Sequence, residues 1–156
     1  MKTIECSDEL IDKLELFRDE LKQELMANED IQAVFIFNSY LPWFYQKLEP
    51  YQFQLRSLIN IVVDENTNTE YFFRKYYDYL RNYILKLGIY ININIITTKN
   101  LLTPMDEYDY NKYFFVNSTV LFDKSDICQS VPLRLYYPQL TKDEPCTLIR
   151  RKKYYR

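Results

Sequence analysis

Three carboxylates around the end of an apolar run are the first residues whose spacing suits a chemical reaction. Asp64 and Glu65 directly follow residues 58–63, which are mostly large aliphatic residues, and Glu70 comes about one helical turn further on. Carboxylates placed in this way can bind Mg²⁺ or orient water for phosphodiester hydrolysis. We therefore take Asp64, Glu65 and Glu70 as candidate catalytic residues, and Asp64 and Glu65 as candidate magnesium ligands. The same pattern is also typical of a turn that leads into the first turn of a helix.

Basic residues are concentrated in two segments and predict contacts with nucleic acid phosphates. The first segment lies within a helical pattern, among several aromatic residues that are suited to stacking on bases, and its candidates are Arg74, Lys75, Arg81 and Lys86. The second segment is the C-terminal end, whose candidates are Arg150, Arg151, Lys152 and Lys153. Both patterns are also typical of solvated surfaces, so a solvent-exposed helix face and a solubilising tail stay open as alternatives.

The composition excludes several classes of active site. The chain has no histidine and one glycine among its 156 residues. Without histidine there can be no Ser-His-Asp triad, no Cys-His dyad and no histidine-ligated zinc. A single glycine also excludes glycine-rich phosphate loops of the P-loop and G-x-G-x-x-G types. The remaining chemistry depends on carboxylates, amides, hydroxyls, lysine and arginine.

Length and cysteine usage predict one domain in a reducing compartment. A chain of 156 residues and 19.2 kDa is typical of a single unit, so we predict one domain over residues 1–156 with a basic tail at 150–156. Three widely spaced cysteines do not resemble a disulfide framework. The N-terminal residues lack the layout of a signal peptide, and no apolar run approaches ~20 residues. We therefore expect a cytoplasmic protein that makes no membrane contact.

Charge is distributed unevenly along the chain. Residues 1–30 contain ten acidic and four basic residues, a net charge of −6, whereas residues 31–156 carry +4. Because an acidic segment repels DNA, we expect the first segment to lie away from any DNA-binding face. Its apolar residues either belong to the core or make a subunit contact, which leaves a homo-oligomer open.

The apolar spacing of the N-terminal half predicts a helix followed by two strands. Ser7 or Asp8 is suited to begin the helix. The apolar stripe of the helix recurs at helical spacing and consists of Leu10, Leu14, Phe17, Leu21 and Leu25. Residues 32–37 predict a strand and residues 38–50 a loop, and a second strand follows within 53–63.

The second half continues with a helix, a strand and a further helix. Thr69 is predicted to cap a long helix, and Gly88 is predicted to end it in a left-handed conformation. Residues 89–96 alternate as a third strand, residues 106–120 form a helical pattern, and residues 120–123 predict a short strand. Beyond residue 130 we expect extended segments or short strands. This order favours an α+β fold, in which helices flank a small mixed sheet.

Four segments together resemble the nucleotidyltransferase superfamily over about residues 10 to 124. Phe37-Asn38-Ser39 corresponds to its Gly-Ser turn, residues 57–63 to its Asp-x-Asp strand, residues 87–97 to the strand with the third Asp, and residues 120–123 to the closing strand. The resemblance implies a nucleotidyltransferase-like topology. In the superfamily, three carboxylates hold two Mg²⁺ ions for phosphoryl transfer.

The chain departs from this family pattern where the chemistry takes place. The three carboxylate positions are occupied by Leu58, Asn60 and Asn94, and Asn38 replaces the glycine of the turn. Neutral amides and a leucine cannot offset the charge of two hard divalent cations. We therefore predict that ordinary nucleotidyl transfer does not occur at this position.

The chain is also similar to a small nuclease of filamentous viruses that infect crenarchaea, in length, in its Tyr-, Ile- and Asn-rich composition and in its degenerate site. This resemblance implies a viral protein of the host cell interior, a nuclease that cuts linear double-stranded DNA with a carboxylate and Mg²⁺. The alternative is an inactive nucleotidyltransferase-like protein that binds nucleic acid or a protein partner, as antitoxin-like minimal nucleotidyltransferases do.

Overall fold

The computed structural model describes residues 2–6, 8–42, 53–88, 90–103, 115, 118–131 and 144–150. The helices and strands follow one another along these residues in this order: β1 (Lys2–Cys6), α1 (Asp8–Met26), β2 (Ile31–Pro42), β3 (Phe53–Val63), α2 (Thr69–Leu87), β4 (Tyr90–Thr97), α3 (Thr98–Leu102), β5 (Thr119–Asp123), the 3₁₀ helix η1 (Ile127–Ser130) and β6 (Glu144–Arg150).

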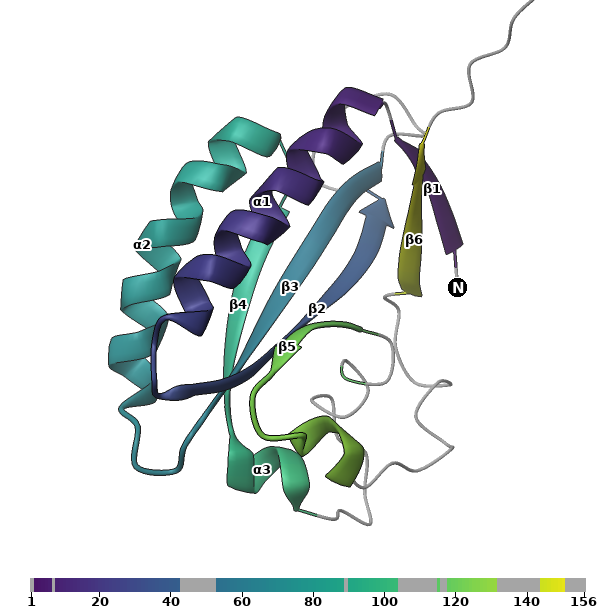
Figure 1. Ribbon diagram of the computed structural model, residues 1–156. Coiled ribbons are helices and arrows are strands. Elements are labelled where there is room, and N and C mark those ends of the chain that lie inside the picture. Colours follow the sequence, from purple (N-terminus) through teal and green to yellow (C-terminus); the bar gives the residue numbers. More distant parts are fainter. Residues whose placement is uncertain are drawn as a thin grey trace, which may run out of the picture.

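The strands form one mixed sheet in the order β1-β6-β2-β3-β4, and β5 pairs with β2 outside this path. Strands β2 and β3 are antiparallel, whereas β3 and β4 are parallel and are joined by the crossover helix α2. Helices α1 and α2 lie side by side on one face of the sheet, and β1 and β6 lie at the other end from α2 (Figure 1). The predicted α+β fold with a mixed sheet flanked by helices is therefore confirmed.

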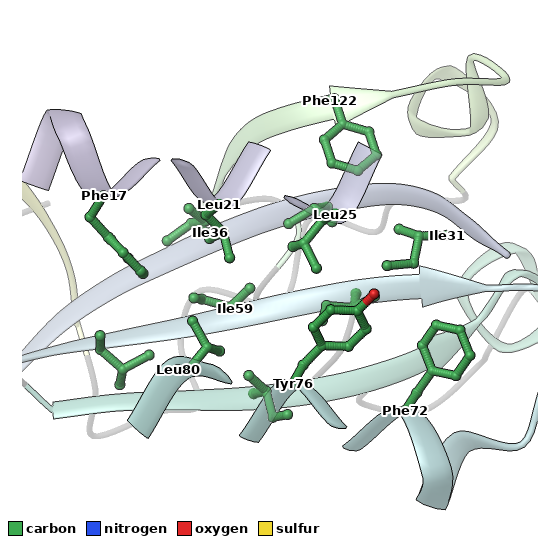
Figure 2. Close-up of a cluster of buried hydrophobic side chains, with 14 of the residues drawn as sticks. Phe17, Leu21, Leu25, Ile31, Ile36, Ile59, Phe72, Tyr76, Leu80 and Phe122 are labelled. Atoms are coloured by element: carbon green, nitrogen blue, oxygen red, sulfur yellow. The ribbon is translucent and has the colours of Figure 1, made fainter. Parts of the chain in front are cut away.

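The main core lies between the two long helices and the sheet. From α1, the predicted residues Leu14, Phe17, Leu21 and Leu25 are buried together with aliphatic side chains of the central strands. Figure 2 shows how Phe17, Leu21 and Leu25 point down onto β2 and β3, where they meet side chains of α2. The side chain of Leu10 lies outside the described residues. The first apolar segment therefore belongs to the core of its own chain.

Helix α2 covers the sheet with the stripe that its spacing predicts. Phe72, Tyr76 and Leu80 are buried, and the other predicted members pack against them partly buried. The Tyr76 hydroxyl accepts a hydrogen bond of 2.9 Å from the Asn28 side chain, which follows α1. This bond satisfies the polar end of a large buried ring. Each helix is thus held by an apolar stripe and by polar contacts to the other helix.

Both ends of α2 have clear local causes. The N-cap is Asn68, whose side chain accepts a hydrogen bond from the Tyr71 amide, so the predicted cap at Thr69 was wrong by one residue. Asparagine and threonine can both cap a helix. Asn68 is the cap because it lies three residues before Tyr71, and its side chain accepts from that backbone amide. Gly88 ends the helix at φ 66° and donates its amide to the Ile84 carbonyl, as predicted.

Replacing Gly88 by alanine is expected to lower the free energy of unfolding by about 1 kcal/mol. A Cβ atom added at Gly88 meets nothing within 4 Å, so the cost is the left-handed backbone alone. Gly88→Asn is the matched control, because asparagine tolerates this conformation better and should lose less. Urea denaturation measures both changes, and an alanine variant as stable as the parent would contradict this account.

The opposite face of the sheet carries a second, smaller core. It contains Ala33 and Phe35 of β2, Val62 of β3 and Ile96 of β4, with cover from Leu101 of α3 and from residues of η1. Phe115 packs edge-on against Phe35 with ring centroids 5.3 Å apart. Both faces of the central strands are therefore buried, which agrees with the continuous apolar run at the end of β3.

Strand β2 corrects the predicted loop over residues 38–50. It continues to Pro42 and stays paired with β3, so that Asn38 lies opposite Ser57 and Pro42 opposite Phe53. The segment that resembles a Gly-Ser turn is therefore part of an antiparallel ladder. Long-range pairing overrides the local turn signal here, because a hydroxyl on β3 satisfies the Asn38 side chain. The rest of the predicted loop lies outside the described residues.

The first and last strands of the structure, β1 and β6, pair with one another. Local sequence patterns did not predict β1. Residues of β1 pair in parallel with β6, from Lys2 opposite Cys146 to Cys6 opposite Arg150. The predicted short strand at residues 120–123 is confirmed as β5, which begins at Thr119. Residues 119 and 120 of the predicted helix over 106–120 therefore belong to β5 instead, and most of the other residues of that prediction lie outside the described residues.

Candidate functional site

Two of the positions that the sequence resemblance aligns with family carboxylates are asparagine amides on neighbouring strands. Asn60 of β3 and Asn94 of β4 lie directly opposite one another in the parallel register. Both alternate with the aliphatic residues that face α1 and α2, so they point to the opposite face of the sheet. The Asn94 amide donates to the Asn60 side-chain oxygen at 3.2 Å. The structure therefore brings together the two asparagines that the sequence placed at this position.

Asn60 is fully buried and its amide group is hydrogen-bonded on both sides. Its nitrogen lies 3.4 Å from the Phe35 carbonyl of β2 and 3.3 Å from the Leu58 carbonyl of its own strand. The Asn60 oxygen accepts from Asn94, as described above. If aspartate replaced asparagine here, a carboxylate oxygen would take the place of this nitrogen. That oxygen would lie against two carbonyl oxygens, which are also acceptors, and none of the three would have a donor. This position is built for a neutral amide.

A second polar pair lies on the helix side of the sheet. The Ser57 hydroxyl donates to the Asn38 side-chain oxygen at 2.7 Å, and both side chains are buried. The sequence pattern predicts only that Asn38 replaces a glycine, and this pair was not predicted. One sequence signal could have predicted the pair. Polar residues on two adjacent buried strands each need a hydrogen-bond partner, and here Asn38 and Ser57 are partners of one another.

The candidate catalytic residues lie at the surface, where β3 leads into α2. Asp64 and Glu65 are exposed and line an open depression of about 430 Å³ together with Asp30. The Gln32 amide donates to Asp64 at 3.3 Å. Glu70 does not line this depression, and its carboxylate pairs with the Arg74 guanidinium at 2.7 Å on the exposed helix surface. The predicted group of three carboxylates is therefore split into a pair and a separate ion pair.

No three carboxylate or thiol side chains converge as a metal-binding group within the part of the chain that the structure describes. Mg²⁺ commonly binds through one or two carboxylates and keeps several waters. Asp64 and Glu65 are therefore the residues that could hold a single ion, with Asp30 lining the same depression.

The four basic residues of α2 do not form one patch. Lys75 lines a depression with Glu24, Glu29 and Asp30, and its ammonium lies 5.4 Å from the Tyr76 ring centroid. Lys86 likewise lies on the side of α2 that faces the acidic helix α1. Arg74 and Arg81 share the outer side, since seven residues are about two turns. Residues 151–156 of the basic tail lie outside the described residues.

The outer side of α2 exposes a continuous row of large side chains. Phe73, Tyr77, Arg81 and Leu85 follow one another at four-residue intervals and therefore form one stripe, which we call the α2 outer stripe. Leu85 is 84% exposed, and the Phe73 and Tyr77 rings stack with centroids 5.8 Å apart. Arg81 and the neighbouring aromatic residues were predicted to bind nucleic acid, but this stripe was not predicted.

Four partly buried titratable groups among the described residues have shifted pKa values. Burial, and then a hydrogen bond to Glu20, raises the pKa of Tyr83. Burial and then contact with Asp123 raise the pKa of Cys128 to about 12. Burial alone would raise the pKa of Asp123, but hydrogen bonds from Cys128 and nearby amides lower it overall, so this carboxylate stays ionised at the start of η1. Burial also lowers the pKa of Arg18. The Tyr83 phenol and the Cys128 thiol therefore stay protonated at neutral pH.

Comparison of the chain with protein-family models, with curated proteins and with solved structures gives no match. Among the described residues, no helix is both long and apolar enough to cross a membrane.

Proposed function

We propose that the chain is a non-catalytic protein of nucleotidyltransferase-like topology that acts by binding a protein partner. One observation supports it above the others: Asn60 and Asn94, which the resemblance aligns with carboxylates of that family, are hydrogen-bonded amides on neighbouring strands, and Asn60 is fully buried. Two metal ions require anionic ligands at this position, and both side chains are neutral. Their amide nitrogens donate hydrogen bonds to carbonyl and amide oxygens of the protein. The proposed activity is therefore recognition.

A protein partner fits the surface charges better than nucleic acid does. Helix α1 contains seven acidic and three basic residues and lies beside α2. Lys75 and Lys86 face that acidic helix, and Glu70 already pairs with Arg74. Phosphate binding needs several cations that are free to replace counterions on one face. Arg81 in the α2 outer stripe is instead flanked by Tyr77 and Leu85, and this mixture is typical of protein interfaces.

Site-specific photocrosslinking tests the proposal. A benzophenone amino acid at Tyr77 should give discrete adducts that protease removes and nuclease leaves intact. Placement at Met26, which is also exposed but lies at the end of α1, is the matched control and should give none. Arg81→Ala should weaken partner binding by about 30-fold, the effect of one interface hot spot. Adducts that only nuclease removes, or equal adducts from Met26, would refute a protein partner at this stripe.

The nuclease stays a second candidate because of the depression that follows β3. Asp64 and Glu65 line it together with Asp30, and one hydrated Mg²⁺ needs only one or two carboxylates. Purified protein is incubated with linear duplex DNA, with Mg²⁺ or with EDTA. Mg²⁺-dependent fragmentation that Glu65→Ala abolishes and Glu9→Ala leaves unchanged would support the nuclease and contradict a purely binding role. Transfer of a labelled nucleotide would contradict both.

A further inference from the structure

The sheet has an open edge at β4. This strand ends the order β1-β6-β2-β3-β4, so among the described residues only its β3 side is paired. Proteins usually block such an edge with charged residues, proline, a bulge or a short strand, because its backbone groups can pair with another chain. The eight residues of β4 include no charged residue and no proline, and their register with β3 has no bulge. The edge of β4 is therefore suited to accept a further strand.

The α2 outer stripe begins above this open edge. Lys75 and Tyr79 lie on the flank of α2 that faces α1. Positions two residues apart on a helix point about 200° apart, so Phe73 and Tyr77 lie on the flank away from α1. These two rings are 40% and 45% exposed. Figure 1 shows α2 next to β4 at one side of the molecule, with α1 on the inner side of α2. The open edge and the exposed rings thus belong to one continuous surface.

A two-fold axis at the middle of β4 would cover both parts of this surface. It places β4 antiparallel to the β4 of a second copy, and it places the two α2 helices antiparallel above that joint. Helix α2 runs antiparallel to β4, because it is the crossover between two parallel strands. At their usual rises α2 and β4 are about 28 and about 26 Å long. The axis therefore passes α2 near its middle, at about residues 78–81.

The side chains near this axis complement their own copies. Asp78 and Arg81 are both exposed, and neither makes an ion pair within the part of the chain that the structure describes. In the antiparallel helix pair, Arg81 of each copy lies beside Asp78 of the other copy, so two pairs of opposite charge form. The same guanidinium lies beside the Tyr77 ring of the other copy. Phe73 lies toward Leu85 of the other copy, an apolar contact at each end of the stripe.

The geometry points to a second copy of this chain as the partner at the α2 outer stripe. The two copies join edge to edge through β4 into one continuous sheet, and their α2 helices pack against one another. A lone strand from another protein would cover the edge but would leave the stripe exposed. The Ile93 amide donates to the Asn92 side chain at 2.9 Å, a local bond that pairing can replace. The inference rests on the proposed function, because it identifies the protein partner proposed there.

Sedimentation velocity of the full chain from about 2 to about 200 μM tests the inference. The mass should change reversibly from one chain of 19.2 kDa to twice that value. Asn92→Lys places a cation on the exposed side of the β4 edge and should weaken the dimer by about tenfold or more. Gln23→Lys is the matched control, because it makes the same kind of change on the exposed face of α1. A monomer throughout, or equal weakening by Gln23→Lys, would overturn the inference.

Charge reversal tests the two-fold arrangement itself. Arg81→Glu and Asp78→Arg each bring like charges together across the axis, so each variant alone should dimerise about tenfold more weakly or worse. An equal mixture of the two variants restores opposite charges at both contacts and should dimerise about as tightly as the parent. Circular dichroism checks that both variants are folded. A mixture that stays monomeric, or single variants that dimerise like the parent, would overturn the inference.

Crosslinking separates a failure of this inference from a failure of the proposed function. A benzophenone amino acid at Tyr77 of the purified chain should give an adduct of twice the chain mass. If the purified chain stays monomeric and Tyr77 crosslinks only a protein of another mass in a cell extract, the second copy is excluded and the proposed function stands. If neither setting gives a protein adduct, both are contradicted.

Discussion

Asn60→Asp is expected to lower the free energy of unfolding by about 3–5 kcal/mol at neutral pH, as an unpaired buried charge does. Asn60 has no exposed surface, and its nitrogen donates to the Phe35 and Leu58 carbonyls. Aspartate replaces this donor by an oxygen that faces the same two oxygens. Urea denaturation measures the loss, and Asn94→Asp is the matched control, because Asn94 is only partly buried and should lose less.

The loss in Asn60→Asp should depend on pH with a defined sign. An unfolded aspartate titrates near ~3.9, and burial without a cation raises the folded-state pKa above that value. The protonated form is therefore favoured in the folded protein, so the penalty is smallest below about pH 4. It grows as the pH rises toward the folded-state pKa and is constant above it. A penalty that shrinks with rising pH would show that a cation or a donor meets the carboxylate.

The effect of Mg²⁺ on the stability of Asn60→Asp tests the proposed non-catalytic role. If the amide position has no cation site, millimolar Mg²⁺ should leave the stability of Asn60→Asp unchanged. If Mg²⁺ restored stability in this variant but not in Asn94→Ala, the position would retain the geometry of a metal cage. That result would contradict the proposed non-catalytic role, because one substitution would then recreate part of a nucleotidyltransferase site.

The elements that the sequence predicts well are those whose signal is local. The stripe of α2, its stop at Gly88 and the alternation over residues 89–96 each depend on spacing within one segment. The parallel pairing of β3 with β4 follows from the crossover helix between them, so the register that joins Asn60 to Asn94 is within reach of sequence reasoning. These features specify the mixed sheet and its helical face.

Features that depend on distant partners were missed. β1 is a strand because β6, from the other end of the chain, pairs with it. Residues after Phe37 continue β2 because Ser57 satisfies Asn38 and the ladder extends to Phe53. A local pattern contains no information on either partner. The turn residues of the loop prediction were therefore outweighed by pairing.

The same limit applies to the candidate site. Sequence proximity grouped Glu70 with Asp64 and Glu65, but Glu70 does not line their depression and pairs with Arg74 on the helix surface. Helical spacing places Arg74 on the same face as Arg81, and Lys75 on the same face as Lys86. What spacing could not show is that α1 packs beside α2, so that the lysines face acidic residues. The charge available to a ligand is decided by packing between helices.

Leu21→Ala is expected to lower the free energy of unfolding by about 2–5 kcal/mol, the usual cost of a buried leucine. Leu21 has no exposed surface and packs in the core that α1 shares with α2 and the sheet (Figure 2). Leu16→Ala on the same helix is the matched control. Leu16 is 59% exposed, so its change should stay within about 0.5 kcal/mol. Urea denaturation measures both values.

The pair of leucines also decides between the two roles that the sequence left open for the α1 stripe. A core stripe stabilises each chain independently, so the Leu21→Ala loss should be the same at 2 and at 200 μM protein, concentrations that differ by about two orders of magnitude. A subunit contact would instead make the loss depend on concentration and would shift the sedimentation coefficient. Leu16→Ala, at an exposed position of the same helix, should show neither the loss of stability nor a dependence on concentration. The two variants thus separate a residue that holds α1 in place from one that does not.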